Sequence, residues 1–143
     1  MATRPKPRVF VDADVLLAGA ASPSEHGASL VVLRMAEITL IDAVVSEQVI
    51  AEAERNLAAY LPSALPAFRE LVNRCLRIVS DPTPTELALC HGLADPKDAP
   101  ILAAALREVC PWLVTFNIRY FSPGIRQLPL CAPADSCSMC GRC

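Results

Sequence analysis

Short apolar runs alternate with helix-like segments along most of this chain, and this alternation limits the folds that it can adopt. The first run, Arg8–Val11, is β-branched and aromatic and ends at Asp12. Similar strand-like runs are Ile38–Ile41, Arg77–Val79, Trp112–Thr115 and, as a candidate fifth, Gln127–Cys131. Because helical patterns separate these runs, the strands need crossover connections. The sequence therefore predicts an α/β fold with a central parallel sheet of four to five strands and helices on both faces.

The predicted helices have start and stop signals at their ends. Glu47–Tyr60 has the strongest pattern, because Ser46 suits the N-cap position and apolar residues recur at helical spacing. Thr83 or Thr85 is expected to cap a short helix that ends at Leu89. The other predicted helices are Ala13–Ala20, Gly27–Glu37, Pro66–Cys75 and Lys97–Val109.

The composition is typical of one folded domain. Of the 143 residues, 53% are hydrophobic and 20% are charged, which supplies a core and excludes disorder over the whole chain. We assign residues 1–132 to the folded domain and residues 133–143 to a cysteine-rich C-terminal tail. The 13 basic and 15 acidic residues give a net charge of −2, so no overall basic field favours nucleic acid.

The sequence also predicts a compartment. The apolar stretch near the N-terminus is not typical of a secretion signal, because Asp12 and Asp14 interrupt it. No run approaches the ~18 uninterrupted apolar residues that a membrane-spanning helix needs. Cys75, Cys90 and Cys110 lie in apolar surroundings, as buried thiols do in a reducing compartment. We therefore expect a cytoplasmic protein without a membrane partner.

Polar side chains follow the predicted strands at the edge of the sheet where ligands usually bind. Asp12 and Asp14 come directly after the first strand, and Asn117 lies two residues beyond Thr115. The other candidates are Asp95 and Asp98, at the start of the helix before the Trp112–Thr115 strand, and Glu52, on the long helix.

Each candidate also has an ordinary structural explanation. Asp12 can end a strand or cap a helix, and Asn117 can occupy a turn. Asp95 and Asp98 suit a helix N-terminus, and Glu52 can simply face solvent. Considered together, however, acids that share one corner repel one another unless a divalent cation neutralises them. Because oxygen ligands suit magnesium and manganese, we predict a Mg²⁺ or Mn²⁺ site.

Four segments, taken in order, carry a family resemblance. They are Val9–Leu17, Ser46–Glu52, Asp95–Ala105 and Leu113–Phe121. Together they resemble a PIN domain over about residues 8 to 131, and in particular the VapC-like ribonuclease toxins of toxin–antitoxin systems. The resemblance implies a PIN-like three-layer fold and a divalent-metal-dependent endoribonuclease.

The resemblance also implies residue roles and partners. The implied catalytic residues are Asp12, Glu52, Asp98 and Asn117, of which the first three bind the metal. The implied supporting residues are Asp14, Asp95 and Thr115. Asp14 stands where the family more often has Asn, and Asn117 stands where many members have Asp. The implied partners are an RNA substrate, a cognate antitoxin protein and a second copy of the chain in a homodimer.

Two other functions stay open. Val9–Asp14 is also similar to the nucleophile loop of haloacid-dehalogenase-type phosphatases, although the chain has no convincing Ser/Thr, Lys and cap set for that chemistry. The second is a non-catalytic RNA-binding or interaction module in which Asp14 and Asn117 weaken the site.

For contacts with RNA we single out Arg119 and Arg55, whose cations can bind the phosphate backbone.

The C-terminal tail carries its own candidate site. Four of the seven cysteines are Cys131, Cys137, Cys140 and Cys143, and the last three form two consecutive C-x-x-C steps. Four thiolates can bind zinc or an iron–sulfur cluster. A terminus without metal and a redox-sensitive thiol cluster are the alternatives. The resemblance to PIN domains does not account for these cysteines.

Overall fold

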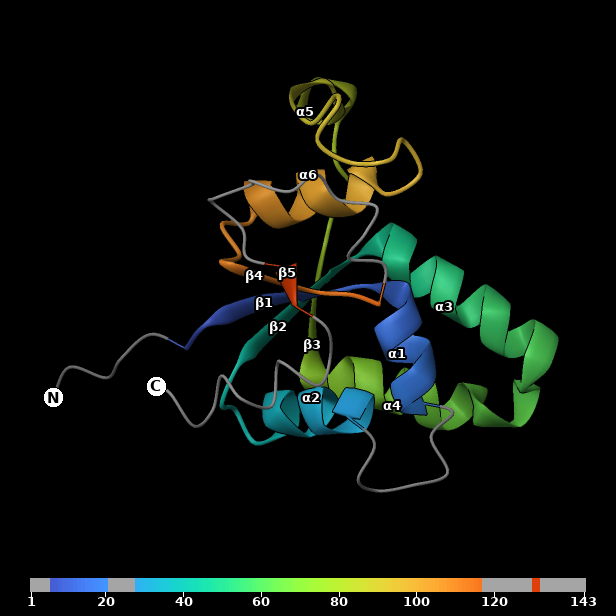
Figure 1. Cartoon of the computed structure of the whole chain (residues 1–143). Coiled ribbons are helices and arrows are strands. Elements are labelled where there is room, and N and C mark those ends of the chain that lie inside the picture. The colour runs from blue at the N-terminus through green and yellow to red at the C-terminus, as the bar shows by residue number, and fades with distance from the viewer. Residues whose placement is uncertain (1–5, 21–27, 117–129, 132–143) are drawn as a thin grey trace, which may run out of the picture.

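A parallel sheet organises the chain (Figure 1). The computed structural model describes residues 6–20, 28–116 and 130–131. The strands are β1 (Arg8–Val11), β2 (Asp42–Ser46), β3 (Leu76–Val79), β4 (Trp112–Val114) and β5 (Leu130–Cys131). Their order is β3-β2-β1-β4-β5, and each neighbouring pair is parallel. The predicted α/β fold is thus confirmed, with β1 at the centre of the sheet.

Helices cover both faces of the sheet, as predicted (Figure 1). They are α1 (Ala13–Ala20), α2 (Ala28–Glu37), α3 (Glu47–Tyr60), α4 (Leu65–Cys75), α5 (Pro84–Leu89) and α6 (Ala99–Arg107), with a 3₁₀ turn η1 (Pro62–Ala64). α6 lies on one face and α2 and α4 lie on the other. None of the helices in the described part of the chain is long and apolar enough to span a membrane.

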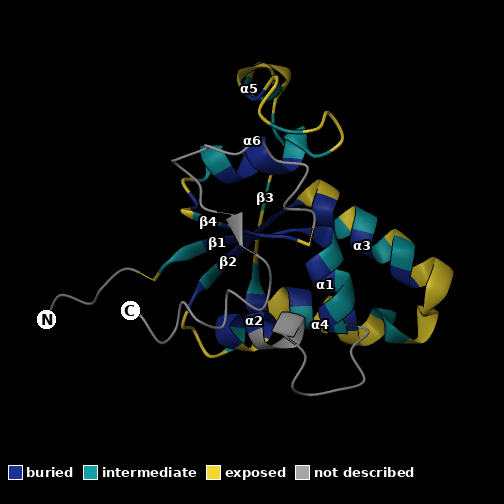
Figure 2. Cartoon of the chain, viewed as in Figure 1, coloured by how far each residue is buried: buried dark blue, intermediate teal, exposed yellow. Residues whose placement is uncertain are grey.

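The core explains why the strand sequences are almost continuously apolar. Val9, Phe10 and Val11 of β1 are fully buried, because helices cover the sheet on both faces (Figure 2). Every residue from Ile101 to Ala105 in α6 is also buried. Asp12 follows β1 and Thr115 follows β4, so the packing of these buried strands fixes the backbone positions of both residues.

The strand predicted at Ile38–Ile41 is wrong. This segment instead closes α2, and β2 begins only at Asp42. Thr39 has a left-handed φ of 63°, and the amides of Thr39 and Leu40 bond back to the carbonyls of Ala36 and Met35. This pattern is a Schellman motif, in which glycine is the usual left-handed residue. A β-branched residue at that position gives a strand-like sequence to what is a helix end.

The C-terminus of α6 has the same motif. Val109 has a φ of 56°. Its amide donates to the carbonyl of Leu106, and the amide of Cys110 donates to the carbonyl of Ala105. The helix therefore ends at Arg107 and not at Val109 as predicted, and it begins at Ala99 and not at Lys97. Apart from these ends, the predicted helix is confirmed.

Two helix starts were predicted from capping residues, with different outcomes. Thr83 caps α5 through a full capping box, in which its hydroxyl accepts from the amide of Glu86 and its own amide donates to the Glu86 carboxylate. Ser46 does occupy the N-cap position of α3, but its side chain makes no capping bond there. Oδ1 of Asp81, 33 positions away, accepts from the amide of Gln48 at 2.8 Å instead.

Candidate active site

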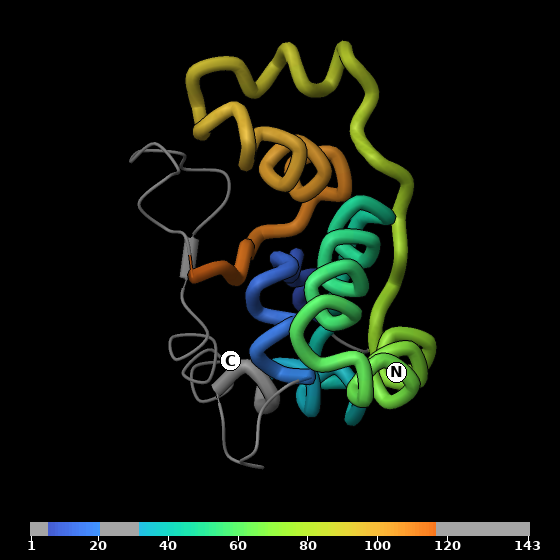
Figure 3. Tube along the Cα trace, turned by 90° about the vertical axis from the view of Figure 1, so that its right-hand side faces the viewer, coloured from blue at the N-terminus to red at the C-terminus, as the bar shows by residue number. Residues whose placement is uncertain are grey.

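A pocket of about 350 Å³ lies where α1, α3 and α6 meet at the carboxyl ends of the strands. Figure 3 views the molecule from this side, with α1 in blue, α3 in green and α6 in orange. The residues that line the pocket are Asp12, Asp14, Gln48, Glu52, Asp95, Lys97, Asp98 and Ile101. The structure thus brings together five of the acids that the sequence singles out.

Asp12 is the most buried of these acids, with 6% of its surface exposed. Because Val11 pairs with Val114, the residues that follow both strands are neighbours. Asp12 Oδ2 accepts a hydrogen bond from the Thr115 hydroxyl at 2.8 Å, and Oδ1 accepts from the Ala13 amide at 2.7 Å. Burial raises the pKa of Asp12, and these two hydrogen bonds oppose that rise.

Asp14, in the first turn of α1, is a second partly buried acid. Its Oδ2 accepts from the amide of Phe116 at 3.2 Å. Its Oδ1 is buried and has no hydrogen-bond partner among the described residues. Burial, together with the charge of Asp12, raises the pKa of Asp14 to about 6. The oxygen without a partner and the raised pKa both indicate that a cation beside Asp14 would stabilise its ionised carboxylate.

Asp95 and Asp98 come from the loop that leads into α6. Asp98 occupies the N-cap position of α6, but its side chain makes no capping bond. Asp95 Oδ1 accepts from the amide of Lys97 at 3.0 Å, which holds the turn between the two acids. Burial raises the pKa of Asp98, and the charges of Asp12 and Asp95 add to the rise, whereas Lys97 opposes it.

The sequence interpretation missed two polar residues of the pocket. Gln48 lies one helical turn before Glu52, so both side chains project from the same face of α3. Lys97 is the basic residue of the pocket lining, and no ion pair joins its ammonium to another described side chain. The signal for Gln48 is its spacing of one helical turn from Glu52, and the signal for Lys97 is its position between Asp95 and Asp98.

The other candidates either do not line the pocket or lie outside the described residues. Arg55 is exposed on α3 and does not line it. Asn117 and Arg119 lie outside the described residues, as do the three cysteines of the tail, Cys137, Cys140 and Cys143. Cys131 ends β5.

The donor set of the pocket fits a hard divalent cation. Carboxylates supply the oxygen ligands that Mg²⁺ and Mn²⁺ prefer, and Asp14 leaves a buried oxygen without a partner. Within residues 6–20, 28–116 and 130–131, no three acidic, histidine or cysteine side chains are close enough to hold an ion as they stand. Mg²⁺ usually keeps several waters and binds through one or two carboxylates, so this spacing is compatible with it.

A comparison with models of protein families identifies the family of this chain. The model of the PIN domain matches residues 8–119, a span that contains all the residues of the pocket. The chain belongs to the PIN-domain family. The resemblance to PIN domains, which rested on four ordered segments of the sequence, is thus confirmed.

Two solved structures have the same PIN-domain fold. One is a chain of VapBC2 from Rickettsia felis, solved bound to a DNA fragment from the promoter; it is 17% identical and has a TM-score of 0.63, with 87% of this chain and 98% of that chain covered. The other is Mycobacterium tuberculosis VapC20, a toxin that cleaves the sarcin–ricin loop; it is 16% identical and has a TM-score of 0.53, with 73% and 86% covered. No curated protein matches the chain.

Proposed function

We propose that this PIN domain is a divalent-metal-dependent endoribonuclease that hydrolyses RNA phosphodiester bonds. The observation that carries the proposal is the set of five carboxylates that line one pocket at the carboxyl ends of the strands. Without a cation, this arrangement is electrostatically costly, because the pKa values of Asp12, Asp14 and Asp98 are all raised. Perturbed acids in a cleft are typical of a catalytic site.

In this proposal Asp12 and Asp98 bind the metal ion, and Glu52 either binds it or holds one of its waters. The Thr115 hydroxyl and the Ala13 amide each hold one oxygen of Asp12, which keeps the carboxylate in one orientation. When bound, Mg²⁺ or Mn²⁺ supplies an activated water for attack on phosphorus and neutralises the charge that grows on the phosphate oxygens.

Lys97 is our candidate for contact with the RNA backbone. It lines the pocket together with five acids and keeps its ammonium unpaired among the described side chains. A lysine is a compact cation that suits a phosphate oxygen. Of the two arginines expected from the sequence, Arg55 does not line the pocket, and Arg119 lies outside the described residues.

A cleavage assay tests the proposal. Purified protein is incubated with RNA and Mg²⁺ or Mn²⁺, with and without chelator, beside Asp12→Asn and Asp98→Asn. We expect metal-dependent internal cleavage that falls at least a hundredfold in both variants, because each removes a ligand charge. Glu70→Gln, a change of an exposed acid on α4, is the matched control and should cleave normally.

Two results would replace the proposal. RNA binding without cleavage under any metal would support a non-catalytic RNA-binding module. That second candidate is favoured by one observation, namely that no three ligating side chains of the described residues are close enough to hold an ion as they stand. Hydrolysis of a phosphomonoester with a phosphorylated Asp12 would support the phosphatase alternative.

We further propose that the protein is the toxin of a toxin–antitoxin pair and forms a homodimer. The support is the fold shared with a VapBC2 chain and with the VapC20 toxin. Expression alone should arrest growth, and co-expression of a small protein from the neighbouring reading frame should relieve the arrest and co-purify with this chain. Light scattering of the purified chain measures the oligomeric state, and a monomeric mass would contradict the dimer.

A further inference from the structure

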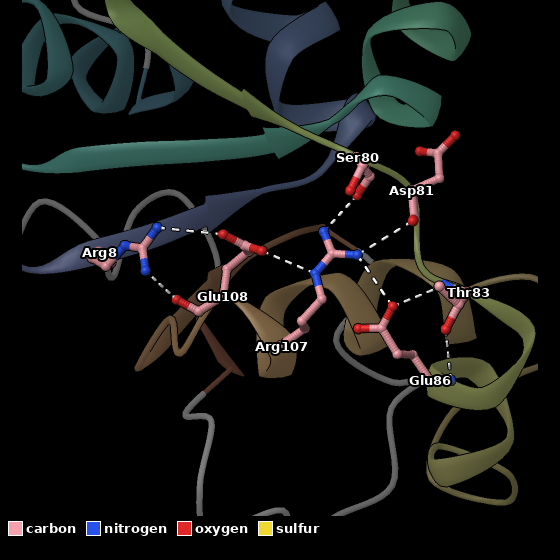
Figure 4. A network of polar contacts seen from close by, with 7 residues as sticks. All are labelled: Arg8, Ser80, Asp81, Thr83, Glu86, Arg107 and Glu108. Carbon is pink, nitrogen blue, oxygen red and sulfur yellow. Dashed lines mark hydrogen bonds and ion pairs between the residues drawn. The ribbon is translucent and has the colours of Figure 1, made fainter.

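The guanidinium of Arg107, in the last turn of α6, joins this helix to the segment after β3 (Figure 4). It donates hydrogen bonds to the main-chain carbonyl oxygens of Ser80 and Asp81. It also contacts the carboxylates of Glu86, at 3.3 Å, and Glu108, at 2.9 Å. Arg107 therefore binds a stretch of backbone as well as side-chain charges.

Asp81 extends this connection to α3. Its Oδ1 accepts from the backbone amide of Gln48, in the first turn of α3, at 2.8 Å. The first amides of a helix have no partner within the helix, and Ser46 supplies none from its side chain. The carbonyl of Asp81 thus contacts Arg107 of α6, while its carboxylate caps α3.

The two helices joined in this way carry residues of the acidic pocket. α3 contributes Gln48 and Glu52, and Asp98 stands at the start of α6. α3 and α6 make few direct contacts with each other, because each packs mainly on other elements. Both helices pack on β2, and the Arg107–Asp81 connection adds a hydrogen-bonded link between them.

We propose that Arg107 and Asp81 are positioning residues, which set the separation of α3 from α6 and thereby hold Glu52 and Asp98 at the spacing that the metal ion requires. This inference rests on the proposed nuclease function. Neither residue contacts the substrate; both act through the helices.

The surroundings of Arg107 distinguish it from an ordinary surface ion pair. Its side chain is 23% exposed, and its planar fork reaches two backbone carbonyls that cannot move without moving the chain. The segment that follows is held by the capping box of Thr83 and Glu86, and Glu86 also pairs with Arg107. Exposed pairs on flexible side chains contribute little to a fold, whereas this network fixes backbone on both sides.

The test compares Arg107→Ala, Asp81→Ala and the double variant with the unchanged full-length chain. Arg74→Ala is the control, because Arg74 is an exposed arginine that pairs with Glu37 and does not contact the segment after β3. Three quantities are measured: hydrogen exchange of the Gln48 amide in metal-free protein by NMR, the affinity for Mn²⁺ by calorimetry, and RNA cleavage.

We expect each single change to speed exchange of the Gln48 amide at least tenfold and to weaken Mn²⁺ binding at least fivefold, with Arg74→Ala unchanged. The double variant should be no worse than the more damaging single change, because both changes break one connection. Arg107→Lys keeps the charge but loses the fork, so it should be intermediate and also serves if Arg107→Ala does not fold.

The proposal is overturned if Arg107→Ala or Arg107→Lys leaves both the Gln48 exchange rate and the Mn²⁺ affinity within twofold of the unchanged chain. It is also overturned if the effects of the two single changes multiply in the double variant. If the unchanged chain binds Mn²⁺ but cleaves no RNA, the nuclease proposal fails, while amide exchange and Mn²⁺ affinity still decide the role of Arg107 and Asp81.

Discussion

The hydroxyl of Thr115 donates a 2.8 Å hydrogen bond to the buried carboxylate of Asp12, although 103 positions separate the two residues. They become neighbours because β1 and β4 are adjacent parallel strands with Val11 opposite Val114. The bond holds one oxygen of Asp12, and the Ala13 amide holds the other. Two buried strands thus determine the orientation of the most buried acid of the pocket.

Replacing Thr115 with Val should raise the pKa of Asp12 further, because the hydroxyl bond favours the ionised carboxylate. Mn²⁺ binding needs that ionised form, so the pH of half-maximal binding should move upward, as calorimetry at several pH values would measure. The lost bond should also lower the free energy of unfolding by about 1–3 kcal/mol. Thr115→Ser keeps the hydroxyl and should behave nearly normally; an unchanged pH profile in Thr115→Val would contradict this role.

Asp14→Asn should stabilise the metal-free protein at neutral pH. The pKa of Asp14 is raised to about 6 in the folded chain from an ordinary value of 3.8. Between these values the folded state binds more protons than the unfolded state, so the stability falls as the pH rises. The penalty is fully present above about pH 6 and absent below 3.8. Discounted for partial exposure, it is about 1–2 kcal/mol.

Urea unfolding measures the effect at two pH values. The first, pH 7.5, is about one unit or more above the upper end of this range, and the second, pH 4, is near its lower end. The variant should gain stability at the higher pH and much less at the lower one. Asp95→Asn removes an exposed acid of the same pocket and is the control. An equal gain at both pH values would mean that the charge of Asp14 is not the cause.

Lys97→Ala should affect RNA and metal in opposite directions. Loss of one phosphate contact should weaken RNA binding and reduce the dependence of log K on log salt by about 0.7 for a single strand. Mn²⁺ binding should become slightly tighter, because the Lys97 charge acts on Asp98 and opposes a cation there. Fluorescence anisotropy at several salt concentrations and calorimetry measure the two quantities. Arg55→Ala is the matched control, and an equal loss of RNA affinity in it would remove the special role of Lys97.

Val109→Gly should increase stability. Val109 is exposed and has a left-handed φ of 56°, a conformation that a β-branched residue adopts at a cost and glycine adopts freely. We expect a gain of about 0.5–1 kcal/mol, since the extra freedom of glycine in the unfolded chain offsets part of the relief. Urea unfolding measures it, and Val109→Ala, which keeps the Cβ atom, should gain less. A loss of stability in Val109→Gly would show that the left-handed backbone carries no strain.

Local sequence signals predicted the helices better than their ends. A cap at Thr83 or Thr85 and the span of α3 were predicted from neighbouring residues; the structure has the cap at Thr83 and confirms the span of α3. Thr39 misled the prediction of a strand at Ile38–Ile41, because its β-branched side chain favours strands while the backbone closes a helix there. Val109 was predicted as the last residue of a helix, but α6 ends at Arg107. The bond from Gln48 to Asp81 had no local signal at all, since 33 positions separate the two residues.

By itself, the sequence determined the alternation of strands and helices, the buried character of β1 and the acids that follow it, because hydrophobic period and residue type are local properties. Only the tertiary structure decided which polar groups face one another. It placed Lys97 and Gln48 among the acids, left Arg55 outside, and made Asp81 the cap of α3. These relationships depend on strand order and on crossover geometry, which join residues that no sequence spacing connects.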